Sequence, residues 1–168
     1  SALVDQLMSI SEAEAGTLKL NYELCHVRKV LSEVVDVYEF VAQEKEIRID
    51  ISEGDFIWNF DRKRVKQAIG NLLDNAIKFS AAGSSIQISV TKEADQLKIW
   101  VKDQGVGIAD SDLDRIWDRL FRGDKSRSTQ GLGLGLSIVK SIAIAHRGRV
   151  EAHSGMQGMI FVMILPQS

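Results

Sequence analysis

Residues 61–80 have the sequence DRKRVKQAIGNLLDNAIKFS, and this stretch decides the fold. Asp61 stands where a helix cap is expected, because its carboxylate can accept hydrogen bonds from free backbone amides. The apolar residues behind it recur at the helical spacing and share one face: Val65, Ala68, Ile69, Leu72, Leu73, Ala76 and Ile77. The stretch therefore predicts an amphipathic helix that packs on a core.

Shorter elements are predicted on both sides of this helix. Alternating apolar residues indicate strands, at residues 18–24, 47–51, 56–60, 86–90, 97–101, 150–152 and 160–165. Helical spacing indicates further helices, at residues 3–10, 30–41 and 135–143. Because helices and strands mix without a regular βαβ alternation, the layered α+β class is predicted.

The composition excludes several classes of protein. A chain of 168 residues suits one domain, and a net charge of −2 provides no basic surface for nucleic acid. The longest apolar runs fall well short of the roughly 20 residues that a membrane-spanning helix needs, so no membrane contact is expected. The single cysteine, Cys25, cannot form an internal disulfide, and the expected compartment is the cytoplasm.

A polar stripe borders the apolar face of the predicted helix. Its members are spaced i, i+4, i+8 and i+11 and so share one side: Gln67, Asn71, Asn75 and Lys78. An asparagine oxygen suits Mg²⁺, which prefers oxygen ligands and shares its coordination sphere with nucleotide phosphates and water. The alternative is a solvated helix face on which the asparagines are incidental.

Two glycine-rich motifs follow. In the segment 103–108, DQGVGI, the carboxylate of Asp103 can accept a hydrogen bond from an amino group such as that of adenine, and the glycines let the backbone approach a flat ligand. The segment 131–136, GLGLGL, runs into a predicted helix whose free amides and dipole favour phosphate. The alternatives are a turn for the first motif and a dinucleotide site for the second, although no buried parallel strand leads into it.

Residues 110–130 form a long polar segment, and such loops in compact domains are usually functional or disordered. Within it, residues 116–122, IWDRLFR, combine apolar side chains that can dock a helical turn with Arg119 and Arg122. The guanidinium fork suits phosphate oxygens. The alternative is a charged surface turn.

In this order, the four motifs resemble the N, G1, F and G2 boxes of the sensor histidine kinases, at residues 71–80, 103–108, 116–122 and 131–136. Residues 137–140, SIVK, also continue the sequence usual in that family. Each box alone is ambiguous, whereas four boxes in register are specific. The resemblance runs from about residue 18 to the end of the chain.

The resemblance implies a Bergerat-type ATP-binding fold, which is a two-layer sandwich of a mixed sheet and helices. It implies that Asn75 coordinates Mg²⁺, that Asp103 recognises the adenine amino group, and that residues of about 110–130 form a lid. It assigns catalytic roles to Asn71, Lys78 and Arg122. The residues implied to contact ATP are Asn71, Asn75, Lys78, Phe79, Asp103, Gly105, Gly107, Ile108, Arg119, Arg122, Gly131, Leu132, Gly133, Leu134, Gly135 and Leu136.

The sequence departs from the family at three positions. Trp117 replaces the usual Phe of the F box, Arg147 replaces the first glycine of a pair, and Met159 replaces a Ser or Thr. We expect none of the three to touch the proposed magnesium or adenine residues, so that the departures affect local loop geometry only.

Neither His26, His146 nor His153 lies in an H-box pattern, and we expect all three to be structural. Residues 1–17 resemble the end of the dimerisation helix that follows the H box, and residues 18–168 the catalytic domain. The resemblance then implies that the acceptor histidine belongs to a separate dimerisation domain of the same parent protein. A response regulator would act downstream, and the parent would be a membrane-anchored sensor.

Three other functions fit the same ATP-binding fold. Gyrase-like, chaperone and mismatch-repair ATPases hydrolyse ATP with a glutamate base where Asn71 stands, and a neutral amide cannot take a proton from water. An anti-sigma-type serine kinase is disfavoured by the F box. A nucleotide-binding module without catalysis is disfavoured by the intact boxes.

Overall fold

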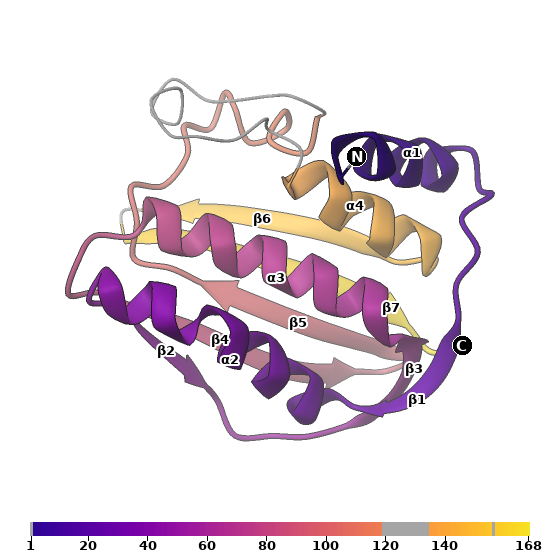
Figure 1. The fold of residues 1–168 in the computed structure, drawn as a ribbon, viewed down its shortest axis with the longest axis horizontal. Helices are drawn as coiled ribbons and strands as arrows, with labels where there is room; N and C mark the ends of the chain where they lie inside the picture. The colour runs from indigo at the N-terminus through magenta and orange to yellow at the C-terminus, as the bar shows by residue number, and fades with distance from the viewer. Residues whose placement is uncertain (1, 119–134, 156) are drawn as a thin grey trace.

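The structure is a computed structural model in which residues 2–118, 135–155 and 157–168 are described. The described helices lie on one face of a sheet (Figure 1) and have the following bounds: α1 (Ala2–Glu14), α2 (Val27–Glu44), α3 (Arg62–Phe79) and α4 (Gly135–Ala145). The described strands are β1 (Tyr22–His26), β2 (Arg48–Ile51), β3 (Ile57–Asp61), β4 (Ser85–Glu93), β5 (Gln96–Lys102), β6 (Arg149–Gly155) and β7 (Gly158–Pro166).

The main sheet has the strand order β2-β4-β5-β7-β6. The β2–β4 pair is parallel and the other pairs are antiparallel, so the sheet is mixed, as the family resemblance implies. Strands β1 and β3 form a separate antiparallel ribbon at one end of the molecule (Figure 1). The α+β class with two layers is therefore confirmed.

The central helix α3 forms as its sequence predicts. Asp61 caps it by accepting a hydrogen bond from the Arg64 amide at 3.0 Å. All the predicted apolar positions of this helix are buried, and they pack against the sheet between α2 and α4 (Figure 1). No helix among the described residues is long and apolar enough to cross a bilayer.

The prediction of a strand over residues 18–24 places its start too early. The amides of Thr17 and Leu18 donate to the Glu12 carbonyl and end α1, so this backbone is not available to a sheet. The strand begins at Tyr22, and its inward side chain is Cys25, whereas Leu24 is 75% exposed. An alternation of four apolar residues was thus a misleading guide to which face is buried.

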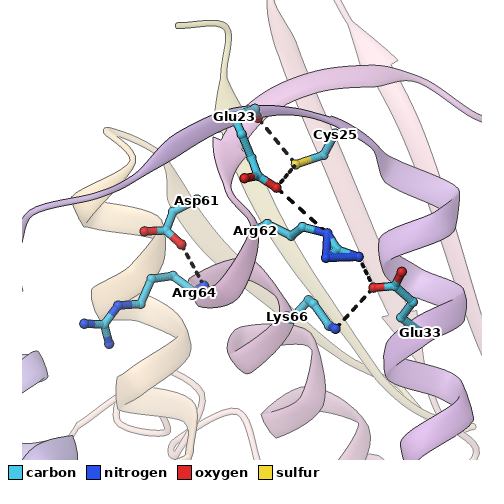
Figure 2. A network of polar contacts seen from close by, with 7 residues as sticks. All are labelled: Glu23, Cys25, Glu33, Asp61, Arg62, Arg64 and Lys66. Carbon is cyan, nitrogen blue, oxygen red and sulfur yellow. Dashed lines mark hydrogen bonds and ion pairs between the residues drawn. The ribbon is translucent and has the colours of Figure 1, made fainter.

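A polar network joins α2 and α3 to the β1–β3 ribbon (Figure 2). The Arg62 guanidinium contacts Glu33 of α2 and lies 4.0 Å from Glu23 of β1, while the Lys66 ammonium lies 3.2 Å from Glu33. Hydrogen bonds from Arg62 and then from Lys66 hold the pKa of Glu33 at about 2. Burial raises the pKa of the Cys25 thiol to about 11, so this thiol is a neutral packing group.

The turn after α4 carries two unusual residues. Arg147 has a φ of 63°, in the left-handed region that favours glycine, so its departure from the family strains the turn without preventing it. His146 is buried, accepts a hydrogen bond from the Asp61 amide through Nε2 at 3.0 Å, and contacts the Ile142 carbonyl through Nδ1 at 2.7 Å. This ring joins the end of α4 to the start of α3, which is the structural role expected for it.

Acidification is expected to destabilise the fold through His146. Burial lowers the pKa of this ring below its ordinary value of 6.5, although the Ile142 carbonyl and the Asp61 carboxylate oppose the shift. The unfolded chain therefore binds a proton first, and the free energy of unfolding falls as the pH decreases from 6.5 through the folded pKa. Thermal unfolding measured across this window by circular dichroism should show the decline.

His146→Gln provides the control, because its amide offers a donor and an acceptor, as a neutral imidazole does, but does not titrate. We expect this variant to lose most of the slope of stability against pH. His153→Gln, at a position whose side chain is 59% exposed, should keep the slope of the unmodified chain. Equal slopes for the unmodified chain and His146→Gln would contradict the assignment.

Candidate active site

The polar stripe of α3 is half-buried and borders the start of α4. The Asn71 amide nitrogen donates to the carbonyl of Gly135, the first residue of α4, at 3.5 Å. Lys78 pairs with Asp74 at 2.9 Å, and the Lys78 side chain is 39% exposed. Asn75 lies half-buried one turn before Lys78. The stripe is thus partly accessible, and Asn71 links it to the helix that follows the G2 box.

The C-terminal turn of α3 is fixed from two sides. The Lys45 ammonium, just after α2, donates to the carbonyls of Ile77 at 2.7 Å and Lys78 at 2.9 Å, which have no partner within the helix. On the other side, Ser80 forms an antiparallel bridge with Gly105. This bridge brings the end of the N box directly against the G1 loop. Lys45 lies 32 positions before Ile77 in the sequence, and no local pattern indicates this contact with the end of α3.

Asp103 is a buried residue, 3% exposed, and its carboxyl group is held through one oxygen. Its Oδ1 accepts hydrogen bonds from the amides of Gly105 at 2.9 Å and Met159 at 3.1 Å. Burial raises the pKa of this carboxyl group, and the two backbone hydrogen bonds oppose the shift. The carboxyl group therefore has a fixed orientation at the end of β5.

Close backbone contacts explain two of the glycines around Asp103. A Cβ on Gly105 would lie 2.4 Å from the Phe79 carbonyl oxygen, and a Cβ on Gly158 would lie 2.2 Å from the Asp103 carbonyl oxygen. Both distances are shorter than any non-bonded carbon contact allows, so only glycine fits. Gly105 lets the loop backbone pack directly against the end of α3, and Gly158 lets β7 pack directly against the start of the loop.

The expectation that Met159 stays clear of the adenine residues is wrong. The β5–β7 register pairs Lys102 with Ile160, which places Met159 beside Asp103. The Met159 amide donates to the Asp103 carboxylate, and its carbonyl accepts from the Asp103 amide at 2.9 Å. The contact uses the Met159 backbone, so it does not require the Ser or Thr that is usual at this position.

The predicted docking of the F-box segment is confirmed for its first two apolar residues. Ile116 is buried, and the Trp117 ring meets the Phe161 ring edge-on at a centroid distance of 5.8 Å. Residues 110–117 form a series of turns. The remaining predicted residues of this segment and most of the G2 box lie outside the described residues: Arg119, Arg122, Gly131, Leu132, Gly133 and Leu134. Gly135 and Leu136 begin α4, as predicted.

The donor set on α3 fits Mg²⁺. Asn71 and Asn75 provide neutral amide oxygens, the hard ligands that this ion accepts. The described residues contain no group of three or more His, Cys, Asp or Glu side chains that could hold a metal without help. An ion at this stripe would therefore share its sphere with ligand phosphates and water, which is how Mg²⁺ is usually held.

Residues 60–168 match the family described as histidine kinase-, DNA gyrase B-, and HSP90-like ATPases, and this range includes α3, the Asp103 loop and α4. The chain belongs to this family. Its relatives include the sensor protein KdpD of Clostridium acetobutylicum, which is 36% identical over 168 residues, or 98% of this chain and 19% of the relative. The sensor histidine kinase WalK of Bacillus subtilis is 31% identical over 90% of this chain and 26% of the relative.

Solved histidine kinases have the same fold. The histidine kinase AdeS of Acinetobacter baumannii superimposes with a TM-score of 0.82 at 26% identity, covering 99% of this chain and 78% of AdeS. Full-length ShkA in complex with AMPPNP gives a TM-score of 0.87 at 25% identity, covering 99% of this chain and 35% of ShkA. The chain is the catalytic ATP-binding domain of a sensor histidine kinase, with the Bergerat fold, and spans 19% and 26% of the first two curated relatives.

Proposed function

We propose that this domain binds Mg²⁺-ATP and transfers the γ-phosphoryl group to a histidine on a separate dimerisation domain. The observation that supports the proposal is the Ser80–Gly105 bridge, which brings the end of the helix that carries the neutral amides against the loop that follows the buried Asp103. The complex of ShkA with AMPPNP supports a nucleotide at this fold. A response regulator is the proposed acceptor downstream.

Each proposed residue has a distinct role. Asp103 accepts a hydrogen bond from the adenine amino group, with Gly105 and Gly107 letting the base approach the backbone. Asn75 coordinates Mg²⁺, with Asn71 one turn away, and the ion neutralises charge on the phosphates. Lys78, Arg119, Arg122 and the segment 131–135 contact the phosphates. Phosphoryl transfer depends mainly on positioning and charge neutralisation, which these groups supply.

The helix α1 supports an assignment to the end of a dimerisation helix. Its residues Ile10 and Ala13 are buried, and the helix packs beside α4 (Figure 1). The outer side exposes Val4 and Met8, which are 51% and 55% accessible. We infer that residues 1–17 connect the catalytic domain to the dimerisation domain, and that residues 18–168 form the catalytic unit with a lid at about 110–130.

Loss of the Asn75 amide is expected to remove the dependence of ATP binding on Mg²⁺. Even an outer-shell partner of a metal ligand is typically worth about 10- to 100-fold in metal affinity, so Asn75→Ala should weaken Mg²⁺-ATP by at least about tenfold. Binding without Mg²⁺ should change little. Calorimetry of ATP with and without Mg²⁺ measures both values.

Gln67→Ala is the matched control, because it removes an amide from the same stripe two turns earlier, at a position with no proposed contact to ATP. It should bind Mg²⁺-ATP like the unmodified chain. Full-strength, Mg²⁺-dependent binding by Asn75→Ala would remove this residue from the metal site.

A further inference from the structure

The β6–β7 hairpin holds both ends of the loop that follows β5. At the first end, Asp103 exchanges backbone and side-chain hydrogen bonds with Met159 of β7. At the other end, the Ser154 hydroxyl of β6 accepts a hydrogen bond from the Ile108 amide at 2.9 Å. The loop of residues 103–108 is thus clamped by two strands that lie about 50 positions later in the sequence.

Ser154 also lies against the loop at Gly107. Gly107 has a φ of 67°, and a Cβ built on it would lie 3.0 Å from the Ser154 hydroxyl oxygen. The hydroxyl therefore fills the space that Gly107 leaves open while it binds the next amide. A β6 residue without this oxygen would leave the Ile108 amide without its partner and a gap beneath Gly107.

We propose that Ser154 is a positioning residue that sets the 103–108 loop for recognition of adenine and so contributes to the preference for this base. This inference rests on the proposed ATP-binding function. Oδ1 of Asp103 is already used by the amides of Gly105 and Met159, so recognition of the base amino group falls to Oδ2. The direction of Oδ2 and the position of the Gly105–Gly107 backbone relative to the base both depend on how the ends of the loop are held. Ser154 holds the distal end through its hydrogen bond with the Ile108 amide.

The test compares ATP with inosine triphosphate, which carries a carbonyl where ATP carries the amino group and an N–H where ATP has the acceptor N1. The Kd of inosine triphosphate divided by the Kd of ATP therefore measures recognition of this edge of the base separately from the phosphates. For Ser154→Ala we expect this ratio to fall about fivefold, the effect of losing one neutral hydrogen bond. ADP should weaken by the same factor as ATP, because the change affects the base and not the phosphates.

Two further variants distinguish a role of Ser154 in positioning the loop from a general loss of stability. Ser154→Thr keeps the hydroxyl on a strand, where a β-branched residue is favoured, and should restore this ratio to within about twofold of its value in the unmodified chain. Thr91→Val removes another hydroxyl that accepts a hydrogen bond, from Trp100 at 2.8 Å, on β4 away from the loop. It should leave the ratio unchanged even where it lowers the Tm.

The possible outcomes are distinct. A Kd ratio that is unchanged in Ser154→Ala, whether or not both nucleotides bind more weakly, would refute the positioning role while leaving the proposed function intact. An unmodified chain that binds neither nucleotide would overturn the proposed function, and this inference with it. Equal binding of both nucleotides by the unmodified chain would refute recognition of the amino group, and so this inference, while leaving ATP binding intact. A lowered ratio that Ser154→Thr restores is the result that supports both.

Discussion

Asp103→Asn is expected to weaken ATP and ADP by the same factor, about 10- to 100-fold, because a hydrogen bond to a charged group contributes about 1.5–3 kcal/mol. The substitution keeps one carbonyl oxygen, which can still accept from the amides of Gly105 and Met159. It replaces the other oxygen with an NH₂ group, which is a donor and cannot accept from the adenine amino group. The loop should therefore persist while the proposed contact is lost.

A second variant and a control distinguish loss of base recognition from damage to the loop. Asp103→Ala also leaves the two amides unpaired, so it should lower the Tm more than Asp103→Asn does. Asp55→Asn changes another aspartate that accepts from a backbone amide, that of Arg28 at 3.0 Å, and should bind ATP normally. Calorimetry with ATP and ADP measures the effect. Unchanged affinity in Asp103→Asn would mean that the carboxylate does not recognise the base.

The sequence was most informative where local interactions determine the structure. The helix α3 follows from a capping residue, a 3.6-residue apolar period and its length, all of which act within one segment. The burial of its apolar face and the half-buried stripe beside it agree with that prediction. The Asp103 position at the end of β5 was predicted in the same way, from an alternating strand followed by glycines.

The contacts that hold the site in place could not be predicted, because they join residues far apart in the chain. The register of β5 with β7 decides that Met159 lies beside Asp103, and no local pattern specifies that register. The bond between Ser154 and Ile108 spans 46 positions, and that between Lys45 and Ile77 spans 32. The residues proposed to touch the ligand lie in local sequence motifs, whereas the residues that support them are brought into contact only by the pairing of the strands.

The chain is expected to phosphorylate a supplied dimerisation domain and not itself. Its three histidines lie outside any H-box pattern, and His146 is buried in hydrogen bonds to the backbone. With γ-labelled ATP and a purified dimerisation domain that carries an H-box histidine, we expect label only on that partner. Substituting that histidine should abolish the labelling. Label on a serine of the partner would instead indicate a serine kinase.

The same experiment should show little release of phosphate, because the family resemblance implies that Asn71 stands where related ATPases carry a glutamate base. A positioned base typically contributes about 10²–10⁴-fold, and a neutral amide cannot provide it. Withholding the base suits a kinase, since water would otherwise compete with the acceptor imidazole. The Asn71 amide also donates to the Gly135 carbonyl at 3.5 Å, a bond that a carboxylate cannot make.

Asn71→Glu is therefore expected to lower transfer to the partner without producing an efficient hydrolase. The new carboxylate would face the Gly135 carbonyl oxygen, and repulsion between the two acceptors should disturb the first turn of α4. Asn71→Gln, which keeps the donor, should retain more transfer than Asn71→Glu, and the ratio of label transferred to phosphate released measures the difference. Steady-state hydrolysis by the unmodified chain at a rate similar to transfer, and lost in Asn75→Ala, would instead place the domain among the ATP hydrolases of its family.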